Sequence, residues 1–127
     1  VLPDRVEAYH GKIYSKLLVI EASYALDNFF NGRYYNNNDL SGLSINAYLN
    51  FIENDQEEKL ADKINEQFDK IITQLDELDN DFSMQVVEDN LAMLSTYDVI
   101  QANVVLLKVD MLQKLNINVD YADADRD

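Results

Sequence analysis

LADKINEQFDKIITQLDEL, residues 60–78, is the stretch that decides the fold. Its apolar residues recur every three or four positions, which places them along one side of an α-helix. They are Leu60, Ile64, Phe68, Ile71, Leu75 and Leu78. Acidic, basic and amide residues fill the other side, as on a solvated helix face. We therefore expect an amphipathic helix near residues 56–78.

Three further segments have the same periodicity, near residues 4–31, 44–53 and 83–115. The first opens after Pro3, a residue favoured at the first helical position. It closes at Gly32, which can adopt the left-handed conformation of a helix stop. With 3 glycines and 1 proline, the chain lacks the turn residues that many short strands require. These features predict an all-α fold, with residues 1–127 forming a single antiparallel helical-bundle domain and residues 116–127 an extended acidic tail.

The composition excludes several classes of function. A formal net charge of −14 repels a phosphate backbone, so we expect no nucleic acid partner. No apolar run approaches the length of a bilayer span, and no membrane insertion by this chain is expected. The absence of cysteine excludes disulfides, thiolate nucleophiles and cysteine-rich zinc sites. The hydrophobic content of 47% is that of a folded domain.

Motifs for catalysis and metal binding are incomplete. Glu7 and His10 form the E-x-x-H unit of di-iron bundles, but such a bundle needs this unit twice and the chain has 1 histidine. The alternative is an incidental pair on a helix surface. Alternating aspartates at the end of the chain resemble the start of a calcium loop or are simply a frayed acidic terminus: Asp123, Asp125 and Asp127. We expect no catalytic residue, no metal-ligating residue and no cofactor in this chain.

The connection after the first helix is the best candidate for recognition. Tyrosine and asparagine give amphipathic contact area at low entropic cost, and Arg33 is an isolated cation in an acidic protein. The alternative is an ordinary loop that wraps the end of the bundle. The candidate residues for ligand or interface contact are Asp27, Asn28, Asn31, Arg33, Tyr34 and Tyr35.

Two stretches together resemble one family. The first is residues 27–32, DNFFNG, with Gly42-Leu43-Ser44 following; the second is residues 106–117, LLKVDMLQKLNI, with residues 119–127, VDYADADRD. They resemble the C-terminal half of imelysin-like proteins, bacterial envelope proteins linked to iron and named for insulin-cleaving peptidase activity. The pattern departs from the family at Asn116, where glycine is usual, and in the tail, which ends Asp-Arg-Asp rather than Asp-Gly-Asp.

The resemblance implies a double bundle in which this chain is the C-terminal half and forms one wall of a cleft. The partner would be the N-terminal half of the same iron-regulated protein, in the periplasm or as an outer-membrane lipoprotein. Iron or another divalent metal would bind only in the complete protein. The family's G-x-H-x-x-E signature is missing here, so no catalytic role is carried over, and ligand or metal binding linked to iron acquisition is favoured over proteolysis. The alternative is a stand-alone acidic helical protein-interaction module.

Apolar residues outside the main stripes predict an uncovered surface. Three long or medium helices cannot bury every side of one another, so we expect these residues to form an exposed patch where the second half would pack. The residues are Leu18, Phe30, Val86, Val99, Val105 and Leu112. The chain begins with Val1 rather than methionine, which also suggests a piece of a larger protein.

Overall fold

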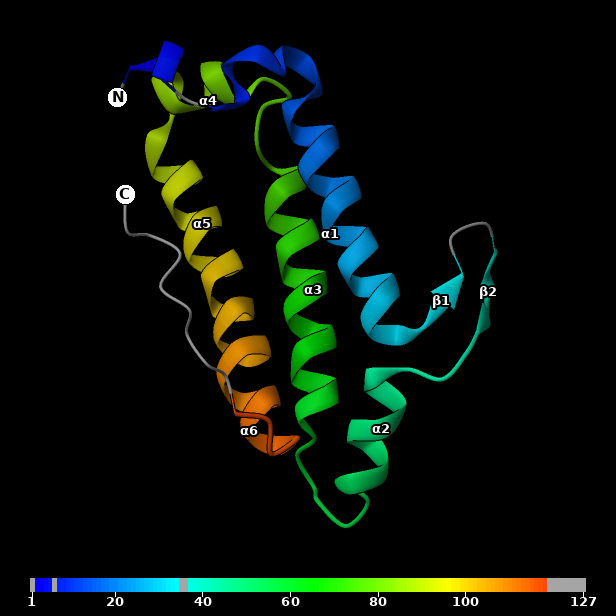
Figure 1. Ribbon diagram of the computed structural model, residues 1–127. Helices are drawn as coiled ribbons and strands as arrows, with labels where there is room; N and C mark the ends of the chain where they lie inside the picture. Colours follow the sequence, from blue (N-terminus) through cyan, green and yellow to red (C-terminus); the bar gives the residue numbers. More distant parts are fainter. Residues whose placement is uncertain (1, 6, 35–36, 119–127) are drawn as a thin grey trace.

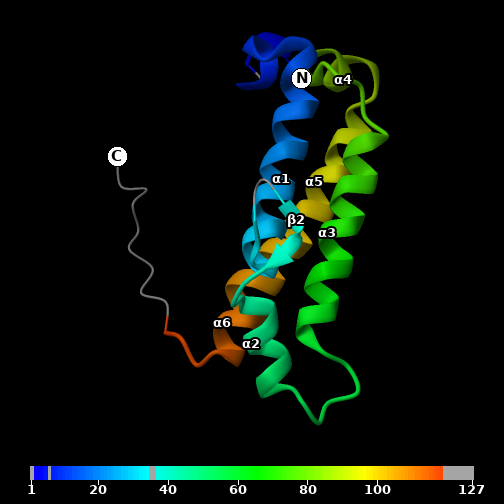
Figure 2. The same ribbon diagram turned by 90° about the vertical axis from the view of Figure 1, so that its right-hand side faces the viewer.

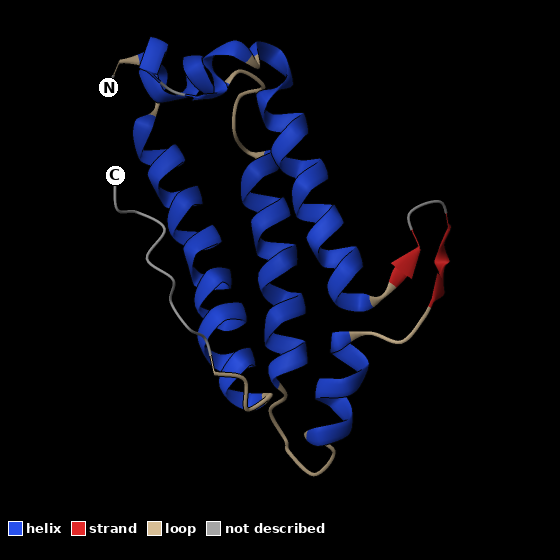
Figure 3. Ribbon diagram, viewed as in Figure 1, coloured by secondary structure: helices blue, strands red, loops and turns tan. Residues whose placement is uncertain are grey.

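The computed structural model describes residues 2–5, 7–34 and 37–118. Its architecture is all-α, with five helices packed together (Figure 3). A π-helical segment, Leu106–Met111, and a final turn, α6 (Leu112–Lys114), extend the last of them. The five are α1 (Ser15–Asn31), α2 (Ile45–Ile52), α3 (Leu60–Asp76), α4 (Phe82–Glu88) and α5 (Asn90–Val105).

Helix α3 is the centre of the molecule. It packs against both α1 and α5, and the chain direction alternates from α1 to α3 to α5 (Figure 1). The predicted apolar stripe forms the core, because Ile64, Phe68 and Leu75 are all buried. The core has two clusters. In the lower cluster, Ile64 and Phe68 pack with Phe30 and Leu49; in the upper cluster, Ile71 and Leu75 pack with Phe82, the first residue of α4. The predicted central amphipathic helix is thus confirmed.

The first helix begins later than the sequence indicated. Residues before Ser15 form three 3₁₀ turns: η1 (Pro3–Arg5), η2 (Glu7–His10) and η3 (Lys12–Tyr14). Lys12 has a φ of 48°, a left-handed value that an α-helix of L-residues cannot continue through. The Ser15 hydroxyl donates a hydrogen bond to the Lys12 carbonyl at 2.6 Å, at the point where the regular helix starts. The expected helix over residues 4–31 is therefore wrong in its first eleven residues.

Helix α3 begins at Leu60 rather than near residue 56, because its cap comes from another element. Glu53, at the end of α2, is 2% exposed, and its Oε2 accepts the Leu60 backbone N–H at 2.8 Å. Its Oε1 forms an ion pair with Lys114 Nζ at 2.9 Å. A carboxylate at a helix N-terminus satisfies a free N–H and favours the helix dipole. Glu53 thereby joins the end of α2 to the start of α3 and to α6.

The expected helix over residues 83–115 is interrupted. Asp89, with φ −146° and ψ 83°, ends α4, and its side chain caps α5 by accepting the Ala92 N–H at 3.1 Å. This break lets α4 cross the end of the bundle, where it packs against the 3₁₀ turns (Figure 1). The rod ends at Asn116, whose φ of 54° is the left-handed conformation expected at a helix stop. The sequence missed the break because Asp89 lies within an otherwise unbroken apolar period.

A hairpin replaces the expected irregular loop after α1. Strands β1 (Arg33–Tyr34) and β2 (Asn37–Ser41) pair antiparallel and project beside the helices (Figure 1). Gly32 caps α1 with a φ of 66°, and its carbonyl accepts the Gly42 N–H at 2.8 Å. A Cβ at Gly32 would lie 2.8 Å from the Ser44 Cβ, so glycine is needed here for space as well as for conformation.

We predict that Lys16→Met lowers the free energy of unfolding by about 1–2 kcal/mol, because charge-assisted bonds to helix C-terminal carbonyls are lost. Lys16 Nζ donates to the carbonyls of Asp76 and Leu78, each at 2.9 Å, which ties α1 to the C-terminal end of α3. Urea denaturation measures the change. Lys70→Met, on the exposed face of α3, is the control and should change stability by less than about 0.5 kcal/mol. Equal effects of the two substitutions would contradict the proposed role of Lys16.

We predict that the cap of α4 makes stability depend on pH. The Ser83 side-chain hydrogen bond, together with the Ser83 and Met84 backbone N–H groups, lowers the pKa of Asp81. The folded state therefore binds this proton more weakly than the unfolded state. The resulting stabilisation is present above the ordinary pKa and is lost as the pH falls through the lowered one.

Asp81→Asn keeps an oxygen that can cap the helix but removes this titration. Urea denaturation between about pH 5 and about pH 2.5 should therefore show a smaller loss of stability for the variant than for the wild type. Parallel losses would show that the Asp81 carboxylate is not linked to folding.

Candidate functional site

Three of the candidate contact residues meet at the C-terminal end of α1. Arg33 Nη1 donates to Asp27 Oδ2 at 2.7 Å, and Asn31 Nδ2 donates to Asp27 Oδ1 at 2.7 Å. Both carboxylate oxygens of Asp27 are therefore engaged. The arrangement fixes the entry to the hairpin, because Arg33 is the first residue of β1.

The same cluster continues into α2 and α3 through asparagines that the sequence did not single out. Asn31 Nδ2 also donates to Asn65 Oδ1 at 2.8 Å, and Asn46 Nδ2 donates to Asn31 Oδ1 at 2.6 Å. Asn50 Nδ2 in turn donates to Asn46 Oδ1 at 2.7 Å. We call Asp27, Asn31, Arg33, Asn46, Asn50 and Asn65 the amide network. The four-residue spacing of Asn46 and Asn50 was the available signal, since such residues share a helix face.

The chemistry of the amide network is structural. Its members satisfy one another, and the bonds join three helices at the lower end of the bundle. Because partly buried amides cost free energy when unpaired, the network specifies how α1, α2 and α3 meet. It offers an ion pair and amides, rather than an activated nucleophile or base.

The remaining candidates lie apart from the network. Asn28 is half-buried, and its backbone carbonyl accepts the Gly32 N–H. The Tyr34 side chain is exposed. Tyr35 lies outside the described residues. The structure thus brings together Asp27, Asn31 and Arg33.

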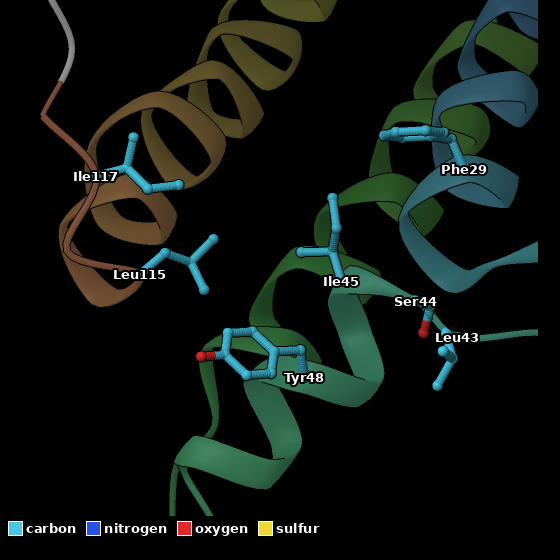
Figure 4. Close-up of a pocket in the computed structure, with 7 residues that line it drawn as sticks. All are labelled: Phe29, Leu43, Ser44, Ile45, Tyr48, Leu115 and Ile117. Carbon is cyan, nitrogen blue, oxygen red and sulfur yellow. The ribbon is translucent and has the colours of Figure 1, made fainter.

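An apolar groove opens beside the network. Phe29 and residues of α2 line one wall, and Leu115 and Ile117 line the other (Figure 4). Its volume is about 460 Å³, and every lining residue is uncharged. Phe29 is 73% exposed and Tyr48 is 56% exposed, so the groove faces solvent. We define the apolar groove by Phe29, Leu43, Ser44, Ile45, Tyr48, Leu115 and Ile117.

Charge is segregated among the helices. Helix α2 has no charged residue and α5 has Asp98 alone, whereas α3 exposes six. Those of α3 are Asp62, Lys63, Glu66, Asp69, Lys70 and Asp76. Large apolar side chains are exposed on the other helices. We call these the apolar face: Leu17, Leu18, Leu26 and Phe29 of α1, Tyr48 and Phe51 of α2, and Leu91, Leu94, Tyr97 and Val105 of α5.

The expected exposed patch is partly confirmed. Leu18 and Val105 are exposed, and Val99 and Leu112 are half-buried. Phe30 was wrongly expected on the surface, because its ring packs 6.1 Å from that of Phe68, centre to centre. Val86 was also wrongly expected there, since the break at Asp89 turns α4 across the end of the bundle and buries it.

The metal motifs give no site in the described part of the chain. His10 is exposed and lies edge-on to the Tyr9 ring at 5.4 Å. Among residues 2–5, 7–34 and 37–118, no group of three or more histidine, cysteine or acidic residues could hold a metal ion. The aspartates 123, 125 and 127 lie outside the described residues.

Within residues 2–5, 7–34 and 37–118, no helix has the length and hydropathy to cross a membrane.

In comparisons with family models, with curated proteins and with solved structures, no match to this chain was found. The resemblance to imelysin-like proteins stays a prediction. The geometry of the groove, the amide network and the apolar face is therefore the basis for assigning a function.

We predict that Asn31→Ala lowers the free energy of unfolding by about 1–3 kcal/mol, because its loss leaves partly buried polar groups without partners. Asp27, Asn46 and Asn65 would each lose a hydrogen bond. Chemical denaturation measures the effect. Asn28→Ala is the matched control, and its effect should stay within about 0.5 kcal/mol. If the two variants were equally stable, the amide network would not hold the three helices together.

Proposed function

We propose that this chain is a helical interaction bundle that packs through its apolar face against a second helical bundle. The observation that carries the proposal is the segregation of charge and exposed apolar side chains. Helix α3 directs its charged residues to solvent, while α1, α2 and α5 expose large apolar residues. A protein that functioned with all these surfaces in water would show the polar pattern of α3 on each helix.

Helix α5 supports this most directly. Thr96 and Asn103 lie on its buried side, yet Leu91, Leu94 and Val105 on other sides are 78%, 51% and 52% exposed. A helix with one covered side normally carries its large apolar residues on that side rather than opposite it. Soluble monomers rarely expose a contiguous apolar patch of more than a few hundred Å². Covering about 600 Å² would contribute about 15 kcal/mol before the entropy cost of association.

The identity of the second bundle follows from the resemblance. We propose that it is the N-terminal half of the same imelysin-like envelope protein, and that the two halves enclose a cleft for ligand or metal binding in iron acquisition. The apolar groove supports this reading, because both stretches that resemble the family line it. Phe29, Leu43 and Ser44 come from the first stretch, and Leu115 and Ile117 from the second.

In this proposal the chain supplies a wall and the fixed shape of one side of the cleft. Metal-ligating and catalytic residues would come from the other half. Peptidase activity is not part of the proposal, since the G-x-H-x-x-E signature is missing from this sequence. The competing function is a stand-alone acidic module that binds a different protein through the same face. A G-x-H-x-x-E segment encoded upstream would favour the first function over the second.

We predict that the isolated chain self-associates or binds a hydrophobic dye such as ANS, and that co-expression with the upstream polypeptide suppresses both. Light scattering after size exclusion and dye fluorescence are the measurements. Leu94→Lys should reduce dye binding, because it places a charge on the apolar face. Thr73→Lys, on the charged side of α3, should leave dye binding unchanged. A monodisperse, dye-silent monomer with cooperative unfolding would overturn the proposed second bundle.

A further inference from the structure

We infer that Asn31 is a deamidation site that reacts only when the lower end of the bundle opens. Asn31 and Gly32 form the single Asn-Gly pair in the sequence. In such a pair the backbone nitrogen of the glycine attacks the side-chain carbonyl carbon of the asparagine, because glycine has no Cβ to hinder the approach. This reactivity belongs to the chain itself and does not depend on what covers the apolar face.

Water is the co-reactant of this reaction. The Gly32 backbone nitrogen loses its proton to solvent and forms a bond to Asn31 Cγ, while the bond from Cγ to Nδ2 breaks and Nδ2 leaves as ammonia. Water then hydrolyses the cyclic succinimide. Cleavage at the side-chain carbonyl gives aspartate, and cleavage at the main-chain carbonyl gives isoaspartate, whose backbone runs through the former side chain. Either product carries a new carboxylate, which is ionised at neutral pH.

The side-chain amide of Asn31 is fixed by residues of three helices, α1, α2 and α3. Asn31 Nδ2 donates to Asp27 Oδ1 at 2.7 Å and to Asn65 Oδ1 at 2.8 Å. Asn31 Oδ1 accepts from Asn46 Nδ2 at 2.6 Å. The attack requires this amide and the following peptide to turn toward each other, which breaks these bonds. Because the bonds are partly buried, breaking them costs free energy.

The attacking nitrogen is engaged as well. The Gly32 N–H donates to the carbonyls of Asn28 and Phe29, in the last turn of α1. In a helix this N–H points along the axis to preceding carbonyls rather than at the side chain of the residue before it. Gly32 also has little room to turn, since a Cβ added to it would lie 2.8 Å from the Ser44 Cβ. The folded chain therefore disfavours the reaction at both reacting groups.

The lower end can open while the rest of the bundle stays folded. Helix α2 is short, and in the turned view it lies below the hairpin, away from the upper turns (Figure 2). The Leu49 side chain of α2 is buried, whereas Tyr48 and Phe51 are 56% and 77% exposed. Segments with little buried apolar area are the ones that open locally. Opening of α2 would break the bond from Asn46 and free the amide of Asn31 to turn.

The products cannot restore the same contacts. A carboxylate at position 31 brings an acceptor oxygen to the place where Nδ2 now donates to Asp27 at 2.7 Å. Attraction there becomes repulsion between like charges. Arg33, which pairs with Asp27, would have to serve two carboxylates. Isoaspartate also adds a methylene to the backbone at the end of α1. A single opening event thereby becomes a lasting change in how α1, α2 and α3 meet.

The first test compares the folded and unfolded chain. Wild-type protein is incubated at mildly alkaline pH, in buffer and in guanidinium chloride, and peptide mapping by mass spectrometry follows the replacement of NH₂ by OH at Asn31. Asn31 should react at least about tenfold more slowly in the folded chain. Asn28 is the internal control, because the bulky Phe29 follows it, and it should react slowly in both conditions. Equal rates at Asn31 in the two conditions would overturn the inference.

The second test asks which part of the bundle must open. Asn46→Ala removes a bond to Asn31 and should speed the reaction of the folded chain by about fivefold. Lys16→Met weakens the opposite end of the bundle and is the matched control, with a rate at Asn31 within about twofold of wild type. Equal rates in the two variants would mean that the amide network does not control the reaction.

The third test uses Asn31→Asp, which has the structure of one product. Amide hydrogen exchange in α2 should be about tenfold faster than in the wild type, while exchange in α4 stays unchanged. Asn28→Asp adds the same charge outside the amide network and should leave exchange in α2 at the wild-type rate. If Asn31→Asp protects α2 as well as asparagine does, the product closes normally and deamidation causes no lasting change.

Discussion

The packing of one side of α3 between α1 and α5 is the interaction on which the rest of the structure depends. Ile64, Phe68, Ile71 and Leu75 are at most 4% exposed, and each lies three or four residues from the next. Helix α1 contributes Phe30 to one end of this row, and the turn into α4 contributes Phe82 to the other. Apolar burial is not directional. This core therefore sets which sides of the helices meet, whereas polar contacts decide where the helices begin and end.

Polar contacts between distant residues define those ends. Lys16 bonds the carbonyls that end α3, and Glu53 accepts the N–H that begins it. The amide network fixes how α2 meets α1 and α3 at the lower end of the bundle (Figure 1). The bonds of Lys16 to Leu78, of Glu53 to Leu60 and among the asparagines are partly buried. An unpaired polar group is costly there, so these bonds favour one arrangement of the helices over others of similar apolar burial. The open apolar groove therefore lies between elements whose positions are well determined.

The difference between the two sides of the bundle relates the proposed function to the fold. One side of the bundle is complete, with a polar surface on α3 that suits water. The other side has a core that is only partly covered and a groove with one wall from residues 29–48 and the other from Leu115 and Ile117. The near absence of charge on α2 and α5 fits a surface that packs through apolar side chains.

The sequence by itself determined the all-α class, the central amphipathic helix, the approximate places of α1 and α2, and the helix stops at Gly32 and Asn116. Periodicity and local conformational preference are properties of neighbouring residues, so they can be read from the chain directly. Of the six contact candidates, Asp27, Asn31 and Arg33 lie together in the structure, because they are within one turn and a short loop. Their contact with a ligand or partner stays a prediction.

Only the tertiary structure decided the breaks at Lys12 and Asp89, the start of α3 at Leu60, and the pairing of the hairpin. It also decided that Phe30 is buried and that Leu115 and Ile117 face Phe29 across a groove. The reason is physical: each of these depends on a partner distant in sequence or on the balance between a local helix preference and packing elsewhere. Glu53 shows this most clearly, since nothing in its own neighbourhood indicates that its carboxylate will cap one helix and pair with a lysine of another.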